Sequence, residues 1–211
     1  MSKMNQMKEH WDKTYGSNEN TKLGWYEEIP AKCLKLFEKC DLSKDDAIID
    51  VGCGASSFMD NLLSRGFTNL IGVDISEKAL SLLKQRLGKK SSLVKWLVDD
   101  ISDSKKVRNI GEVALWHDRA VLHFLIDKNG RQNYLNTLRT ILQKKGYAII
   151  ATFSLSGAKK CSGLDIKNYD ENMLAEFLCP DFKLKEAFNY TYYTPSGSAR
   201  PYVYTLFQRI G

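Results

Sequence analysis

The sequence predicts an α/β fold in a single domain, residues 1–211: an open, mostly parallel sheet with helices on both faces and an antiparallel hairpin at its C-terminal end. Short apolar runs alternate with segments of helical periodicity between residues 47 and 153, which is typical of parallel strands joined by helices. Two alternating runs then flank Pro195-Ser196-Gly197, the pattern of a hairpin. The length of 211 residues suits one hydrophobic core.

Two helices are expected before the first strand. Apolar residues recur at helical spacing from Met4 to Trp11, and Gly16 is a suitable end for that helix. A second helix is expected from Pro30, a favourable first-turn residue, to about Cys40.

The alternating part of the chain predicts five strands, at residues 47–51, 70–74, 93–98, 112–116 and 147–153. Between the first two strands, a helix is expected to end at Arg65-Gly66. Ser76 is suited to cap a helix that stops at Gly88, and Asp127 to cap one that stops before Gly146.

The region after the fifth strand changes character. Residues 154–169 are rich in Gly, Ser and Lys and show no sustained periodicity, so we expect a long ordered loop on the substrate side. Asp170 is then suited to cap a short helix that Pro180 ends. The hairpin strands are expected at residues 182–193 and 202–208.

Composition excludes several classes of protein. Hydrophobic residues make up 43% of the chain, and no apolar run is long enough for a membrane span or a signal peptide, so we expect a cytoplasmic protein that does not contact membranes. Five scattered cysteines without C-x-x-C spacing argue against a disulfide framework and against a metal site. The net charge of +6 comes from dispersed lysine doublets, which disfavours a nucleic-acid partner.

The turn after the first strand carries the chemistry. It reads Asp50-Val51-Gly52-Cys53-Gly54-Ala55-Ser56-Ser57, and two glycines one residue apart let backbone N–H groups approach a ligand. Asp74 follows about twenty residues later, at the end of the second strand, where a carboxylate can accept both hydroxyls of a ribose. The spacing predicts a nucleoside ligand.

A nicotinamide oxidoreductase is the first alternative, because it shares this strand–turn–helix pattern. A dinucleotide site usually carries a third glycine, where this chain has Ser57, and the charge of Asp50 would oppose a pyrophosphate. A nucleoside without phosphates therefore fits better.

Together with Asp99-Asp100-Ile101 after the third strand, the turn resembles the S-adenosylmethionine (SAM) site of class I methyltransferases, a Rossmann-like family with a seven-stranded sheet. The resemblance runs from about Trp11 to Phe207. It implies that Asp50 holds the methionine part, Asp74 the ribose and Asp100 the adenine. The cofactor contacts that it implies are Asp50, Gly52, Cys53, Gly54, Ser56, Asp74, Ile75, Asp100, Ile101, Trp11, Tyr15 and Trp25.

The N-terminal residues 1–40 extend the resemblance. The stretches His10–Tyr15 and Gly24–Tyr26 are similar to the lid of a subgroup that includes the citrate synthase and elongation-factor lysine methyltransferases. The segment Leu115–Phe124 is closer to uncharacterised bacterial methyltransferase domains. The acceptor is therefore expected to be a small molecule or a protein, with lysine as one candidate nucleophile.

His117 and Asp118 are the candidate catalytic residues, because the fourth strand is expected to end beside them, over the methyl group of the cofactor. Either side chain can take the proton of an acceptor or orient it. The simpler alternative is that the pair caps the next helix. A module that binds SAM without transferring its methyl group is the last alternative.

Overall fold

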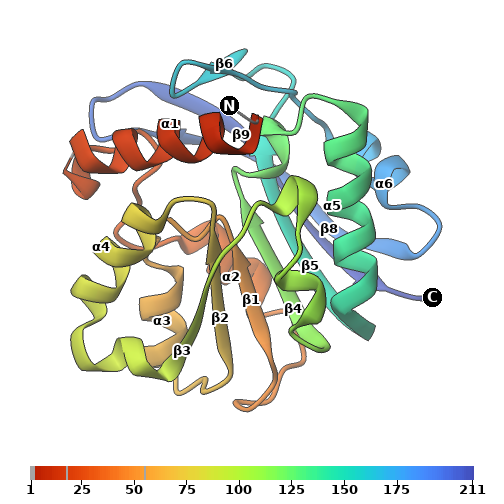
Figure 1. Ribbon diagram of the computed structural model, residues 1–211. Coiled ribbons are helices and arrows are strands. Elements are labelled where there is room, and N and C mark those ends of the chain that lie inside the picture. Colours follow the sequence, from red (N-terminus) through yellow and green to blue (C-terminus); the bar gives the residue numbers. More distant parts are fainter. Residues whose placement is uncertain (1–2, 18, 55) are drawn as a thin grey trace.

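The computed structural model describes residues 3–17, 19–54 and 56–211. Seven strands form one sheet in the order β3-β2-β1-β4-β5-β9-β8 (Figure 1). Their bounds are β1 Ile48–Val51, β2 Leu70–Asp74, β3 Val94–Val98, β4 Val113–Arg119, β5 Leu142–Phe153, β8 Phe182–Tyr193 and β9 Ala199–Arg209. Strands β1 to β5 run parallel, β9 pairs antiparallel with β5, and β8 pairs antiparallel with β9. The predicted fold class is confirmed.

Helices cover both faces of this sheet. Their bounds are α1 Lys3–Ser17, α2 Ala31–Phe37, α3 Phe58–Ser64, α4 Glu77–Leu87, α5 Lys128–Ile141 and α6 Glu171–Leu178. Buried residues of α2, α3 and α4 pack on one face, and those of α5 and α6 pack on the other. Figure 1 shows α1 lying across the top of the sheet, where the parallel strands end.

The three caps predicted from the sequence are confirmed. The Ser76 side chain accepts a hydrogen bond from Ala79 N at 3.0 Å, Asp127 accepts one from Gly130 N, and Asp170 accepts one from Met173 N. Each satisfies a backbone N–H that the first turn of a helix leaves without an intrahelical partner.

Three strands extend beyond their predicted bounds, among them β9, which begins at Ala199 and not at residue 202. Strand β4 continues to Arg119, so His117 and Asp118 lie within the strand and not after it. Strand β5 begins at Leu142, directly after α5, and Gly146 lies inside β5 instead of ending the helix. A Cβ at Gly146 would lie 3.0 Å from the carbonyl oxygen of Ala114, so close packing against β4 explains this glycine.

Helix α2 is shorter than expected. Pro30 is its N-cap instead of a first-turn residue, and the helix ends at Phe37, after which the chain turns through Cys40.

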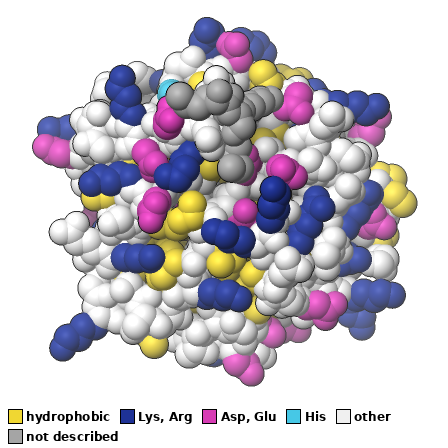
Figure 2. Space-filling model, in the orientation of Figure 1, with side chains coloured by type: hydrophobic (Ala, Val, Ile, Leu, Met, Phe, Trp, Pro, Cys, Tyr) yellow, Lys and Arg dark blue, Asp and Glu magenta, His cyan; other side chains and the backbone are white. Residues whose placement is uncertain are grey.

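The long segment 154–169 contains a small antiparallel pair, β6 (Lys160–Cys161) and β7 (Leu164–Asp165). Figure 1 places this pair above the sheet, on the same side as α1. In Figure 2, Lys and Arg side chains lie among Asp and Glu side chains on the visible face, as the dispersed doublets predicted. None of the described helices is long and apolar enough to cross a membrane.

Candidate functional site

A cavity of about 460 Å³ is lined by residues from the carboxyl ends of β1, β2 and β4 and by residues of α1. It brings together eight of the predicted cofactor residues: Trp11, Tyr15, Trp25, Gly52, Asp74, Ile75, Asp100 and Ile101. A smaller pocket of about 40 Å³ lies on the other side of Gly52 and adds Asp50, Cys53 and Ser56. Gly54 lines neither space, but its N–H donates to Asp74 at 2.8 Å.

The turn after β1 needs both of its glycines. Gly52 has φ +61° and Gly54 has φ +50°, in the left-handed region that favours glycine. A Cβ at Gly52 would lie 2.1 Å from Cγ2 of Val121, and one at Gly54 would lie 2.2 Å from the hydroxyl of Tyr15. The turn is thus packed against both the loop after β4 and helix α1. Ala55, within the same predicted turn, lies outside the described residues.

Asp74 is fixed at the end of β2 by two backbone donors. Its Oδ2 accepts from Gly54 N and its Oδ1 accepts from Ser76 N, each at 2.8 Å. Burial raises the pKa of this carboxyl to about 6, because it outweighs the two hydrogen bonds that favour the ionised form. Asp100, which also lines the cavity, is oriented by Ser102, whose N–H donates to Oδ1 at 2.8 Å.

His117 and Asp50 form a buried pair across β4 and β1. The distance from Nδ1 of His117 to Oδ1 of Asp50 is 2.6 Å, and the imidazole stacks on the ring of Phe58 with centroids 3.9 Å apart. Burial opposes a charge on His117, but the Asp50 carboxylate outweighs it and raises the pKa to about 10. The Asp50 carboxylate therefore favours the protonated form of this imidazole.

Asp118 points to the opposite face of the sheet, because side chains alternate along β4. Its carboxylate accepts from Val121 N at 2.9 Å, Leu122 N at 3.1 Å and the hydroxyl of Tyr134 at 2.8 Å. It lines neither cavity. These contacts match the capping alternative raised from the sequence, whereas the catalytic role of Asp118 stays a prediction.

Sequence reasoning missed Arg119, the last residue of β4, which lines both cavities. Its Nη1 donates to the carbonyl of Trp25 at 2.8 Å, and its Nε lies 3.2 Å from Oε2 of Glu27. The guanidinium carbon lies 5.3 Å from the ring centroid of Tyr192 and 5.2 Å from that of Tyr202. The available signal was its position two residues after His117, which puts both on one face of the strand.

The N-terminal segment closes the cavity with aromatic rings. Trp11 meets Trp25 edge to face at a centroid distance of 5.7 Å, and it meets Phe124 at 5.1 Å. Asp12 joins α1 to the start of α4, because its Oδ1 accepts from the Ser76 hydroxyl at 2.7 Å and from Lys78 N at 3.1 Å.

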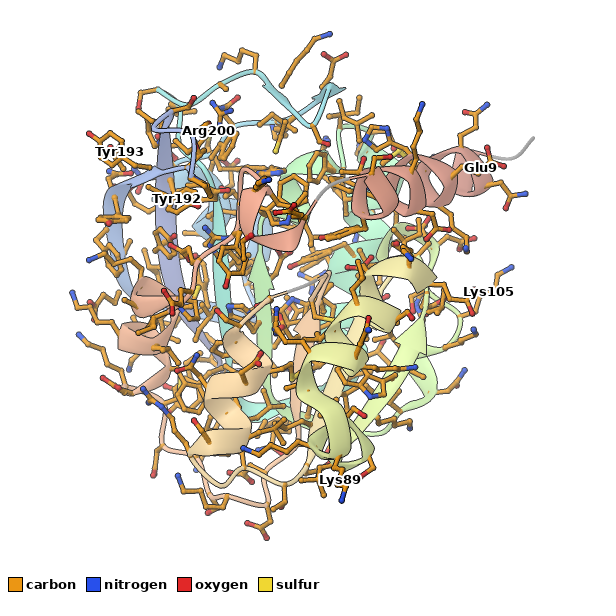
Figure 3. All side chains as sticks on the ribbon, turned by 90° about the vertical axis from the view of Figure 1, so that its left-hand side faces the viewer. Glu9, Lys89, Lys105, Tyr192, Tyr193 and Arg200 are labelled. Atoms are coloured by element: carbon orange, nitrogen blue, oxygen red, sulfur yellow. The ribbon has the colours of Figure 1, made fainter. Side chains whose placement is uncertain are left out.

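On the far side of the cavity, Cys161 of β6 contributes to the wall. Burial raises the pKa of its thiol to about 11, so the thiol is neutral at physiological pH. In the C-terminal hairpin, Tyr192 of β8 pairs with Arg200 of β9, and Figure 3 shows both at the same end of the hairpin.

The family described as methyltransferase domain matches residues 42–193. The chain belongs to this family. It is 26% identical over 191 residues to EEF1A lysine methyltransferase 2 of Danio rerio, covering 84% of this chain and 75% of that one. The Mus musculus protein of the same name is 25% identical over 171 residues, covering 72% and 67%.

Solved structures confirm the fold of this methyltransferase. A SAM-dependent methyltransferase from Anabaena variabilis superposes with a TM-score of 0.78 at 17% identity, covering 99% of this chain and 96% of that one. The 1,6-didemethyltoxoflavin-N1-methyltransferase of Burkholderia thailandensis, solved with S-adenosylhomocysteine, gives a TM-score of 0.73 at 16% identity, with coverages of 100% and 92%.

The expectation of a class I, SAM-dependent methyltransferase is thus confirmed, and the nicotinamide oxidoreductase is set aside. SAM is the cofactor, and the residues present fit it. The left-handed glycines leave room for backbone contact, Asp74 presents a fixed carboxylate, and Oδ2 of Asp50 is buried without a hydrogen-bond partner among the described residues. The family also implies a methyl-acceptor substrate.

Proposed function

We propose that this methyltransferase methylates the side-chain amine of a lysine in a protein. The observation that carries the proposal is the similarity to EEF1A lysine methyltransferase 2, which spans 84% of this chain. We also propose that the enzyme acts in the cytoplasm, in line with the expectation from the sequence. The transfer belongs to the methyltransferase reactions of class EC 2.1.1.

The two spaces support a proposal for the placement of the cofactor. We propose that Asp74 and Ile75 hold its ribose and that Asp100 and Ile101 hold its adenine, all within the large cavity. The remaining proposed cofactor contacts are Asp50, Gly52, Cys53 and Ser56 from the turn and Trp11, Tyr15 and Trp25 from the N-terminal segment. Gly54 would act through Asp74, to which its N–H donates. When bound, SAM supplies a sulfonium-activated methyl group that a nucleophile displaces in line.

The chain's own residues would contribute by position and by exclusion of water. Of the N-terminal residues expected to form the lid, residues 3–17 and 19–27 would cover the site, with Trp11 and Trp25 as the inner surface, whereas α2 packs in the core. Residues 154–169 would form the substrate-side wall through Cys161. Positioning the amine about 3–3.5 Å from the methyl carbon is worth several orders of magnitude in rate. Removal of water from the closed site strengthens the electrostatic interactions inside it.

The amine must be neutral to attack. Burial of a lysine side chain beside Trp11 and Phe124 would disfavour the ammonium form and lower its pKa. In this proposal His117 orients the site through Asp50, and Asp118 is a positioning residue that holds the turn after β4.

The test is an incubation of the enzyme with methyl-labelled SAM and a lysate of its native cells, followed by separation of protein from small molecules. We expect label in a protein band, and methyl-lysine after hydrolysis of that band. Gly52→Val is the matched control, because it blocks the cofactor turn. Label confined to the small-molecule fraction, or to a residue other than lysine, would contradict the proposal.

A further inference from the structure

The small pocket beyond Gly52 is lined by four charged side chains of opposite sign. Asp50 and Glu27 are the acids, and His117 and Arg119 are the bases. Asp50 and His117 are each 2% exposed, and the side chains of Glu27 and Arg119 are 12% and 11% exposed. A volume of about 40 Å³ has room for about three water-sized groups.

Several polar atoms of this pocket are buried without a partner. Within the described part of the chain, Oδ2 of Asp50, Nη2 of Arg119 and Nε2 of His117 have no hydrogen bond. Because an unpaired buried polar atom is costly, folded proteins contain few of them, and polar atoms of this kind around one pocket suit it to a polar ligand. Two of these atoms, Oδ2 of Asp50 and Nη2 of Arg119, carry opposite charges, so they call for a donor and an acceptor on the same ligand.

The charges of the pocket balance. Asp50 pairs with His117 at 2.6 Å, and Glu27 pairs with Arg119 at 3.2 Å. A balanced pocket favours a ligand that brings one positive and one negative group over a single ion. An α-amino-carboxylate is such a ligand, with its ammonium suited to Oδ2 of Asp50 and its carboxylate to the guanidinium of Arg119.

The two spaces share four lining residues. Both are bounded by Tyr15, Trp25, Gly52 and Arg119, so a nucleoside in the large cavity would extend its tail past Gly52 into the small pocket. Arg119 also holds the N-terminal segment, through the carbonyl of Trp25 and the carboxylate of Glu27.

We propose that Arg119 recognises the carboxylate of the cofactor's amino-acid tail, and that this contact, rather than the nucleoside, fastens residues 23–27 of the lid over the site. The inference rests on the proposed placement of the nucleoside in the large cavity. A free amino acid serving as methyl acceptor carries the same chemistry, and the experiment separates the two sources.

The first arm uses the unmodified protein. Calorimetry compares S-adenosylhomocysteine with its analogue that lacks only the carboxylate, and we expect the analogue to bind about tenfold to a hundredfold more weakly. Equal affinities would overturn the proposal. Free L-methionine is then added to protein saturated with S-adenosylhomocysteine. No binding is expected, because the tail fills the pocket, whereas binding would assign the pocket to an acceptor.

The second arm uses Arg119→Met. It should weaken S-adenosylhomocysteine about tenfold to a hundredfold more than it weakens the carboxylate-free analogue, because both ligands share any loss caused by the freed lid. Arg119→Lys keeps the charge but loses the planar guanidinium, so its affinity for S-adenosylhomocysteine should lie between those of Arg119→Met and the unmodified protein. Arg65→Met is the control, since Arg65 pairs with Glu38 at the surface. Equal loss for both ligands would refute recognition of the carboxylate.

The lid is followed by hydrogen exchange of residues 23–27. S-adenosylhomocysteine should slow this exchange several-fold more than the carboxylate-free analogue does at equal saturation, and equal slowing would refute the coupling to the lid. All these measurements are made without an acceptor. A negative result here would therefore not contradict the proposed methylation of lysine. A negative labelling test would likewise not contradict the proposed contact between Arg119 and the cofactor's carboxylate.

Discussion

Gly54→Ala tests whether the contact between the cofactor turn and helix α1 closes the site. Gly54 has φ +50°, and a left-handed conformation costs an alanine about 1–2 kcal/mol. The new Cβ would also lie 2.2 Å from the Tyr15 hydroxyl, against at least 3.4 Å for an ordinary contact, so one of the two must move by about 1.2 Å. Tyr15 is only 6% exposed, so a movement of this size displaces α1 from the turn.

Two separate effects are therefore expected. The backbone strain should lower Tm by about 2–8 °C in a chain of this length, because 1 kcal/mol shifts the midpoint by about 2–4 °C. The displacement of α1 should weaken S-adenosylhomocysteine about tenfold or more in calorimetry, since misplacement by about 1 Å is expensive in a preorganised site.

Tyr15→Phe separates the two effects. Without the hydroxyl, the nearest ring atom lies 3.1 Å from the new Cβ, a distance that a shift of a few tenths of an ångström relieves. The double variant should recover most of the affinity of Tyr15→Phe alone and keep the loss in Tm. The reasoning would be refuted if the double variant bound S-adenosylhomocysteine as weakly as Gly54→Ala does. It would also be refuted if Gly54→Ala bound as tightly as the unmodified protein.

Three further predictions concern charges at the site. The affinity for S-adenosylhomocysteine should fall as pH is lowered through about 6, because Asp74 is then protonated and loses the ionised oxygens that ribose hydroxyls need; Asp74→Asn should bind weakly at every pH in the same titration. Asp50 raises the pKa of His117 from 6.5 to about 10, so the contribution of this pair to the unfolding free energy is fully present below pH 6.5 and is lost as pH rises toward 10. In urea unfolding, the free energy should therefore fall less between pH 7 and pH 9.5 in His117→Gln than in the unmodified protein. Asp12→Ala should cost about 0.5–2 kcal/mol of unfolding free energy and speed hydrogen exchange in α1, since it removes the acceptor at the start of α4, whereas Glu9→Ala on the same helix should change neither.

Local chemistry explains what the sequence determined by itself. The caps at Ser76, Asp127 and Asp170 act within three residues, so their side-chain types and spacing predict the starts of α4, α5 and α6. The left-handed turn at Gly52 and Gly54 is local in the same sense. With the alternation of strands and helices, these signals predicted the sheet, the cofactor and the edge of the sheet where the site lies.

Only the tertiary structure decided how the charged groups of the site are paired. Asp50 meets His117, and Glu27 meets Arg119, because β1, β4 and the N-terminal segment come together in space although they are far apart in sequence. The extension of β4 to Arg119 likewise sends His117 and Asp118 to opposite faces, which adjacency in sequence concealed. Burial then sets their ionisation, since the pKa of a side chain depends on which charges and how much water surround it, and neither is written in local spacing.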